Sequence, residues 1–326
     1  MYLHDDPERF VELIEDCSKK TLISEAMIEK DYYVSLFLKH LIEAEPNIIF
    51  KGGTCLSKCF KLIDRFSEDI DLTMRPNATQ KQKKGMKYHI IDVAKKLGLE
   101  HTNADSVVSG RPFAEHIIKF PTKYASAGLK PFLLVETFFR RTTASTLVLP
   151  TSSLLYEYLK EEGAEEIIAK YGLGPFDATV QSLPITLIDK LHALNSNYLK
   201  GKITSYSRHL YDIHKILPHV VFNEEFFRLL KELGENDRKA LAGLRRPILF
   251  DPADLTASLR KIVSENVYKN DYETTTLPLL FKKVPYEDAV RSLRTALTKI
   301  DGIEEGSLSL DPPMNFIIRS RRTAKA

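Results

Sequence analysis

A strand, a glycine turn, a helix and a second strand follow one another within residues 47–74, and this order constrains the fold more than any other feature of the chain. The first run, NIIFK, is apolar and β-branched, which predicts a buried strand that stops at Gly52 and Gly53. Backbone N–H groups of such a turn point at an anion beside the N-terminus of the next helix, whose dipole favours negative charge. We therefore expect a phosphate-binding turn here.

The helix after this turn adds two polar groups to the expected phosphate site. Leu56, Phe60 and Ile63 recur at helical spacing and form one apolar face. On the same helix, the Thr54 hydroxyl is an extra hydrogen-bond donor. Lys58, one turn later, would supply a counter-charge.

The second strand carries two acidic residues. In the run DIDL, acidic and apolar residues alternate with the period of a strand, so Asp69 and Asp71 project from one face. Two such charges about 4 Å apart repel by roughly 1 kcal/mol in water and roughly 4 kcal/mol at a partly shielded site, unless a cation lies between them. Mg²⁺ commonly takes one or two carboxylates together with substrate phosphates. The alternative is a solvated acidic edge strand whose partners are Arg65 and Lys58.

A superficial likeness to a P-loop, G-x-x-x-x-G-K-[ST], is incomplete. Within residues 52–59, Ser57 replaces the second glycine and Cys59 replaces the hydroxyl that binds magnesium. The sequence therefore disfavours a P-loop NTPase.

The segment GGTCLSK followed by RFSEDIDL resembles the nucleotidyltransferase signature of the AbiEii/AbiGii-type toxin family, within the superfamily that shares the catalytic core of DNA polymerase β. The family motif is Gly-Gly-Thr, a helix bearing Leu and Lys, and then Arg-x-Ser-x-Asp-x-Asp-Leu. The resemblance covers roughly residues 26–217. The chain carries every element of the motif, as Gly52, Gly53, Thr54, Leu56, Lys58, Arg65, Ser67, Asp69, Asp71 and Leu72.

Such enzymes usually carry a third carboxylate on an adjacent strand, and Glu136 in the apolar run FLLVETFF is the candidate. An unpaired acid in a dry sheet is costly, so this residue needs either a partner or solvent, and a position facing solvent is the alternative. The family more often has Asp here, so Glu136 is a departure. Arg140 and Arg141 follow directly and would meet a phosphate or cap the strand end.

A second family signature lies in ITLIDKLHAL and RHLYD. Lys190 matches the lysine of the family's x-K-L-x-A-L helix and would supply a point charge to the triphosphate. Asp212 matches the last residue of R-D-x-x-D, whereas His209 stands where the first Asp is common. Asp212 would orient Lys190 or Arg208, or contact the acceptor. The alternative is an intrahelical pair of Arg208 with Asp212, stabilising by a few tenths of a kcal/mol.

The resemblance implies two-metal nucleotidyl transfer, in which Mg²⁺, or alternatively Mn²⁺, is held by Asp69, Asp71 and Glu136. Glu136 would be the general base or the ligand nearest the attacking oxygen, and Lys190 and Asp212 complete the catalytic set. The residues expected to bind the nucleotide are Gly52, Gly53, Thr54, Lys58, Arg65, Ser67, Lys190 and Arg208.

The family further implies the toxin of a type IV-like toxin–antitoxin or phage-defence system, with a cognate antitoxin as partner. Its expected activity is transfer of NMP from an NTP to RNA, with the tRNA 3′ end as acceptor. Two alternatives stay open: nucleotidylation of a small molecule or a protein, and a catalytically inactive module that binds RNA or a partner.

Charge is nearly balanced, since 47 Lys and Arg face 44 Asp and Glu, and a net charge of +3 does not by itself indicate a nucleic-acid partner. Two basic clusters are typical of solvated faces but would suit an RNA acceptor through phosphate neutralisation. They are Lys81, Lys83, Lys84 and Lys87, and near the end of the chain Arg319, Arg321, Arg322 and Lys325.

The three cysteines form no disulfide framework and lack zinc-ligand spacing with any histidine, so Cys55 and Cys59 are expected to be core thiols. The start MYLHDDPERF lacks an apolar signal-peptide region, and no run approaches the length of a membrane span. These features predict a cytoplasmic protein without membrane contact.

Periodicity predicts an α+β fold in which a small mixed nucleotidyltransferase sheet is flanked by helices. For 326 residues we expect about two domains: a nucleotidyltransferase core with N-terminal helices at residues 1–180, and a helical C-terminal domain at residues 181–326 that completes the nucleotide site. Further strands are expected at residues 114–120 and 131–139. Helices are expected within residues 7–44 (two helices), at 79–97, and after residue 184, including 224–233, 254–267 and 286–300.

Overall fold

The computed structural model describes residues 1–124, 129–139, 145–241 and 252–302. Arg140, Arg141 and the basic cluster near the end of the chain lie outside these ranges.

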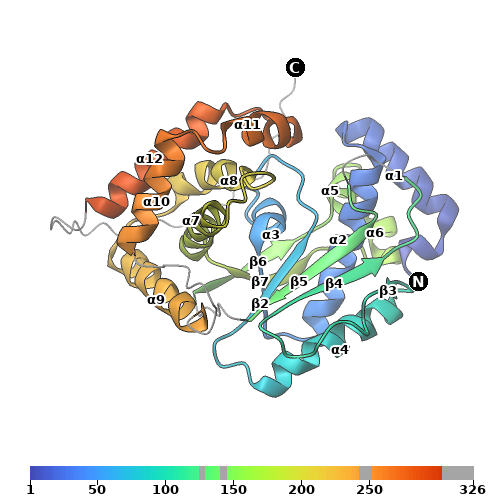
Figure 1. Cartoon of the computed structure of the whole chain (residues 1–326). Coiled ribbons are helices and arrows are strands. Elements are labelled where there is room, and N and C mark those ends of the chain that lie inside the picture. Colours follow the sequence, from blue (N-terminus) through green and yellow to red (C-terminus); the bar gives the residue numbers. More distant parts are fainter. Residues whose placement is uncertain (125–128, 140–144, 242–251, 303–326) are drawn as a thin grey trace.

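A mixed sheet of seven strands forms the centre of the described part of the molecule, with the order β3-β4-β5-β2-β1-β7-β6 (Figure 1). β2 pairs parallel with β5 and β1 pairs parallel with β7, while the other neighbours are antiparallel. The expected mixed sheet is confirmed, but it is larger than predicted because β3, β6 and β7 were not foreseen. The strands are β1 (Ile48–Lys51), β2 (Ile70–Met74), β3 (Glu100–His101), β4 (Phe113–Lys119), β5 (Phe132–Phe138), β6 (Thr146–Thr151) and β7 (Phe176–Gln181).

One face of the sheet is apolar and packs against the N-terminal helices. Alternate residues such as Phe50, Leu72 and Val135 are fully buried there, in one hydrophobic cluster with residues of α1, α2 and α4. This alternation follows from the two-residue period of a strand. The helices are α1 (Pro7–Thr21), α2 (Glu25–Ala44), α4 (Gln80–Lys96), α5 (Leu154–Glu161) and α6 (Glu165–Tyr171), after a short η1 (Leu3–Asp5).

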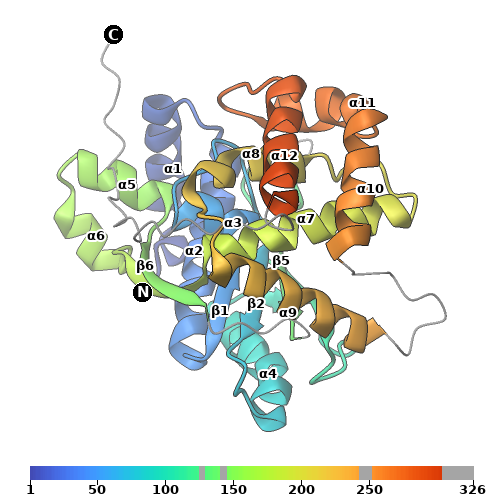
Figure 2. The same cartoon turned by 90° about the vertical axis from the view of Figure 1, so that its left-hand side faces the viewer.

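The C-terminal helices form a second hydrophobic cluster beside the sheet (Figure 2). This cluster also takes in Leu56 and Ile63, so the segment after the glycine turn packs against the C-terminal helices. Phe281 N donates to Asp64 O at 2.8 Å and adds a backbone contact between the two parts. The elements are α7 (Leu183–Leu199), α8 (Arg208–Ile216), η2 (Leu217–His219), α9 (Glu224–Leu241), α10 (Pro252–Ser264), α11 (Lys269–Asp271), η3 (Tyr272–Thr276), η4 (Leu277–Leu279) and α12 (Tyr286–Asp301).

The predicted helices and strands are confirmed within two or three residues at most ends, except that α9 extends eight residues beyond the predicted 233. Cys17, Cys55 and Cys59 are buried free thiols, as predicted for Cys55 and Cys59. Among the described helices, we find none with the length and apolar character that a membrane crossing requires.

Candidate active site

The glycine turn lies directly against the acidic strand. α3 (Gly52–Lys58) begins at the turn, and Gly52 has a φ of 77°, which favours glycine. A Cβ atom at Gly52 would lie 1.8 Å from Asp71 Oδ2, and one at Gly53 would lie 2.6 Å from Arg65 Nη2 and 2.7 Å from Ser67 Oγ. Both positions therefore require glycine. The side chains of Asp71 on the acidic strand, and of Arg65 and Ser67 in the segment before it, occupy the space that a Cβ atom would need.

A row of one base and three acids crosses the sheet on its second, more polar face. Lys51 on β1 pairs with Asp71 on β2, Asp71 pairs with Glu136 on β5, and Glu136 pairs with Glu115 on β4. Directly paired residues project to the same face of a sheet, so their four side chains are neighbours. The expectation that Glu136 stands on a strand adjacent to Asp71 is confirmed. Lys51 and Glu115 were not predicted.

Asp71 and Glu136 are in direct contact. The pKa of Glu136 is raised to about 8, first by burial and then by a hydrogen bond with Asp71 and the negative charges of Asp71 and Asp69. Glu136 is therefore protonated below this pH and donates to Asp71. Two carboxylates in this arrangement fit a hard divalent cation, because the cation would replace the proton and attract both groups.

Asp69 lies one residue before β2 and is held differently from Asp71. Its Oδ1 accepts from Lys130 Nζ at 2.9 Å. Within the described ranges, the structure shows no group of three or more His, Cys, Asp or Glu side chains arranged to hold a metal ion. The structure thus brings Asp71 and Glu136 together and pairs Asp69 with a lysine.

Asp212 is the centre of a buried charge cluster that joins α8, α7 and the segment before β2. Its side chain is fully buried and accepts from Arg65 Nε and Nη2, both at 2.9 Å, and from Lys190 Nζ at 2.7 Å. Burial raises the pKa of Asp212, but the charges and hydrogen bonds of Arg65 and Lys190 outweigh it and hold this pKa well below its usual range. Of the alternatives left open for Asp212, the structure shows the contact with Lys190.

Arg208 does not join this cluster. It is exposed and makes no ion pair with any described acid, so the expected intrahelical pair with Asp212 is wrong and Arg65 is the arginine that Asp212 binds. His209 lies near Lys190. Burial and then the charge of Lys190 hold the pKa of His209 well below its usual value, so this residue is neutral where the family commonly has an acid.

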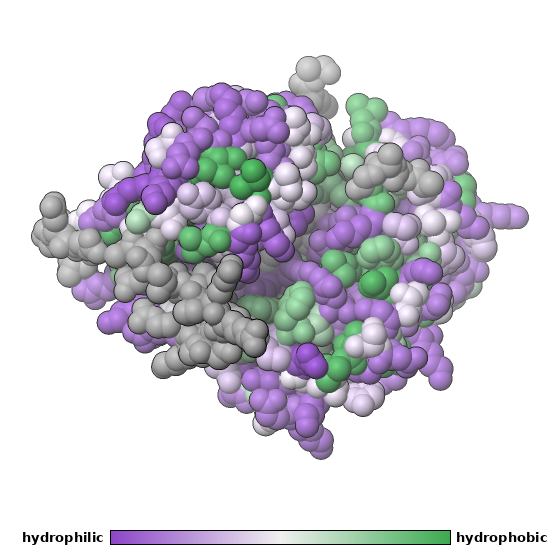
Figure 3. Space-filling view, in the orientation of Figure 1, coloured by the Kyte–Doolittle hydropathy of each residue, from purple (hydrophilic) through white to green (hydrophobic). Residues whose placement is uncertain are grey.

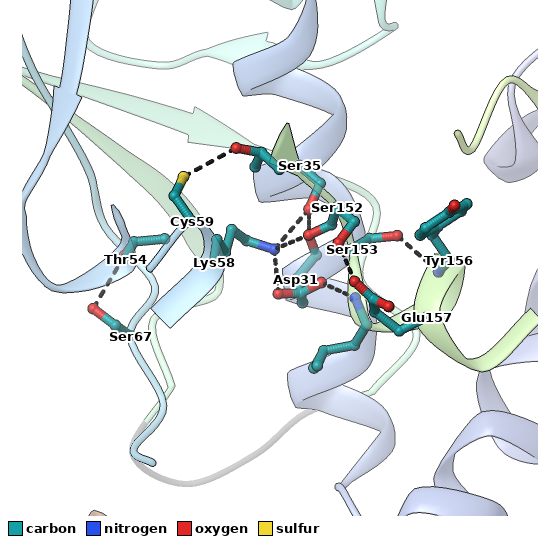
Figure 4. A network of polar contacts seen from close by, with 12 residues as sticks. Asp31, Ser35, Thr54, Lys58, Cys59, Ser67, Ser152, Ser153, Tyr156 and Glu157 are labelled. Carbon is teal, nitrogen blue, oxygen red and sulfur yellow. Dashed lines mark hydrogen bonds and ion pairs between the residues drawn. The ribbon is translucent and has the colours of Figure 1, made fainter. Parts of the chain in front are cut away.

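Lys58, which the sequence predicted as a counter-charge for the phosphate, makes its bonds inside the protein (Figure 4). Its Nζ donates to Asp31 Oδ1 at 2.5 Å, to Ser35 Oγ at 2.7 Å and to Ser152 O at 3.3 Å, in a buried position. An ammonium group has three N–H donors, and all three are used. Lys58 thus ties α3 to α2 and to the segment before α5, and its charge is neutralised by Asp31.

Thr54 and Ser67 bond each other instead of facing solvent. Thr54 Oγ1 donates to Ser67 Oγ at 3.0 Å, and Thr54 is buried (Figure 4). This bond fixes the loop before β2 against α3. The Ser67 side chain is half-buried beside Gly53 and remains the more accessible of the two hydroxyls.

Lys51 adds a positive charge that sequence reasoning missed. Its Nζ lies 3.5 Å from Asp189 Oδ2 on α7 and 5.1 Å from the centroid of the Phe138 ring. The side chain therefore lies between the polar face of the sheet and α7. Figure 3 shows that the molecular surface is hollowed near this junction of the sheet with the C-terminal helices.

The chain is similar to one protein family and to solved structures. Residues 36–299 match the family described as the nucleotidyl transferase AbiEii toxin of a type IV toxin–antitoxin system. MenT4, a nucleotidyltransferase toxin from Mycobacterium tuberculosis H37Rv, has a similar fold, with a TM-score of 0.57, 17% identity, and coverage of 89% of this chain and 90% of that chain.

JHP933 from Helicobacter pylori is also similar, with a TM-score of 0.43, 15% identity, and coverage of 85% of this chain and 94% of that chain. No curated protein matches the chain in sequence.

Proposed function

The chain belongs to the AbiEii family of nucleotidyltransferase toxins, and from this premise we propose that it transfers NMP from an NTP to RNA, with tRNA 3′ ends as the acceptor. The family also implies an antitoxin that counteracts the toxin. The observation that carries the proposal is the Asp71–Glu136 pair, which lies beside the glycine turn and next to Lys51, whose Nζ is 3.5 Å from Asp189 on α7.

Four charged residues of the site would each have a role in this reaction. Lys190 would contact the triphosphate, and Asp212 orients it together with Arg65. Because the Lys190 and Arg65 side chains are held in place before substrate binds, less reorganisation is required to reach the transition state. Glu136 would either hold the cation or accept the proton of the attacking hydroxyl, and its pKa of about 8 in the metal-free protein suits the second role.

A divalent cation, Mg²⁺ in our proposal, would be held by Asp71 and Glu136, with Asp69 as a third ligand once it exchanges its bond with Lys130. When bound, the cation would polarise the α-phosphate and stabilise charge on the leaving pyrophosphate. Asp71 contributes a carboxylate fixed by the neighbouring Gly52, so any residue larger than glycine there would displace it.

The experiment is transfer from each of the four α-labelled NTPs to total RNA in the presence of Mg²⁺. We expect label at RNA 3′ ends. Asp71→Asn should abolish transfer while circular dichroism and the melting temperature show a retained fold, and Glu161→Gln, an exposed carboxylate on α5, should behave as wild type. Label on protein, or only in small molecules, would show that the acceptor is a protein or a small molecule and not RNA. Full activity of Asp71→Asn would exclude the carboxylate site.

A further inference from the structure

The N-terminal half of α4 is strongly basic. The run QKQKKGMKY at its start contains Lys81, Lys83, Lys84 and Lys87 and no acid. Positive side chains in the first turns of a helix oppose its dipole, which costs about 0.3–1 kcal/mol for a charge at the end of the helix, whereas Lys95 in the last turn lies at the favourable end. The arrangement therefore concentrates positive potential at a local cost in stability.

These lysines have no acidic partner among the described residues. Lys81 and Lys84 are exposed, and Lys83 is half-buried, yet none of the three forms an ion pair or a side-chain hydrogen bond with a described residue. Exposed lysines elsewhere are of both kinds, since Lys19 binds Asp16 at 3.1 Å whereas Lys231 and Lys261 form no ion pair with a described residue, so it is the grouping of three unpaired lysines within one turn that sets α4 apart. The charge of this half-helix is thus available to an external anion.

A shallow hollow adjoins the lysines and is itself basic. Lys83, Lys87 and Arg111 line it together with Ser109 and Gly110, and its lining contains no acid. Lys87 Nζ donates to Val107 O at 2.9 Å, which holds the loop before β4 against α4.

Gly110 allows this close approach of the loop to α4. It has a φ of 74°, and a Cβ there would lie 2.6 Å from Lys84 Cγ. The loop therefore packs against the aliphatic part of the Lys84 side chain.

The hollow and the row of acids lie on opposite faces of the sheet, because Ala114, His116 and Thr137 in its lining alternate with Glu115 and Glu136 along β4 and β5, so an RNA bound at α4 would pass round the ends of these strands to reach the acids. Arg111 lies four residues before Glu115, and four residues of extended chain span at most about 14 Å. In the view of Figures 1 and 3, α4 lies below the sheet, and its surface there is mainly hydrophilic. Tyr88, which is 57% exposed, adds an aromatic ring of the kind that stacks on nucleobases.

We propose that the first turns of α4, with Arg111, are the docking surface for the phosphate backbone of the RNA acceptor, and that they hold the RNA while its 3′ end lies at Asp71 and Glu136. This inference rests on the proposed function, because it supplies the part of the site that would bind the acceptor. Several separate lysines and an exposed ring suit a flexible phosphate chain better than a single small anion.

The test measures RNA affinity without NTP, so it is independent of catalysis. We expect the variant Lys81→Gln/Lys83→Gln/Lys84→Gln to bind tRNA at least tenfold more weakly than wild type at 100 mM salt. Each lost phosphate contact should reduce the slope of log K against log salt by about 0.7, giving a reduction of about 2 for three contacts. None of these side chains makes a described bond, so the melting temperature should change little.

The matched control is Lys231→Gln/Lys261→Gln/Lys299→Gln, which removes the same charge from exposed lysines on α9, α10 and α12. It should retain the wild-type slope. In transfer assays the α4 variant should show a raised KM for RNA, with kcat and the KM for NTP unchanged. Equal RNA affinity and slope in the two triple variants would overturn the docking surface. If the α4 lysine variant lost RNA affinity but the wild type transferred no label to RNA, the proposed function would be overturned. The docking surface for RNA would then still stand.

Discussion

Replacing Glu136 by glutamine should stabilise the metal-free protein at alkaline pH and abolish transfer. The side chain keeps its shape but can no longer ionise. In the wild type, burial and the adjacent Asp71 raise the pKa of Glu136 to about 8. At pH 9 the carboxylate of Glu136 is charged beside that of Asp71, and the amide of the variant removes this repulsion.

The size of this difference in stability follows from the pKa shift of Glu136. Raising a pKa from 4.5 to about 8 corresponds to about 5 kcal/mol if the group were fully shielded from solvent. Glu136 is partly buried and partly reached by solvent, and solvent screening should reduce this to about 1–2 kcal/mol. An acid whose folded pKa is raised loses stability as pH increases from its unfolded pKa to its folded pKa. Wild type should therefore lose about 1–2 kcal/mol relative to the variant between pH 4.5 and 8, and nothing more above that.

The assay is urea unfolding with a chelator present, at pH values from 4.5 to 9. Glu115→Gln, which changes an exposed carboxylate in the same row, should alter the unfolding free energy by only a few tenths of a kcal/mol. Added Mg²⁺ at 100 times its Kd should stabilise wild type by about 2.7 kcal/mol at pH 9 and the Glu136→Gln variant by less. A difference between wild type and this variant that does not change with pH would refute the reasoning.

Two further substitutions separate the buried ion pairs. Asp212→Asn leaves Arg65 and Lys190 without their carboxylate, and should lower the free energy of unfolding by about 3–5 kcal/mol, measured by urea, and raise the KM for NTP. Lys58→Met leaves Asp31 without its lysine and should lower the free energy of unfolding by a similar amount. The KM for NTP of the folded variant should nevertheless stay within about twofold of wild type. A tenfold increase in that KM would place Lys58 at the nucleotide after all.

Local patterns made the centre of the fold predictable. Strand and helix periods over residues 47–74 predicted β1, α3 and β2, and the family resemblance, applied to the lone acid in an apolar run, pointed to Glu136 on a neighbouring strand. The edge strand β6 gave no such signal. It contains Pro150, and Val148 is 62% exposed, so it lacks the buried alternation of a central strand.

Contacts between distant segments were not predictable from spacing. Arg65 and Asp212 are 147 positions apart, and Lys58 and Asp31 are 27 apart. A lysine one helical turn after a glycine turn can point toward the phosphate or toward the core, and only the buried carboxylate of Asp31 decides between them. Lys51 was missed because its place in the acidic row depends on the strand register.

Two kinds of partly or fully buried acid occur in the protein, those paired with a base and those paired with another acid, and the second kind marks the candidate active site. Asp31 and Asp212 are buried and each meets a lysine or arginine, so the chain neutralises them itself. Asp71 and Glu136 meet each other instead. Stability alone disfavours this pair, because one amide would remove the repulsion. The pair is useful only when a cation binds, so the same substitution should move stability and transfer in opposite directions.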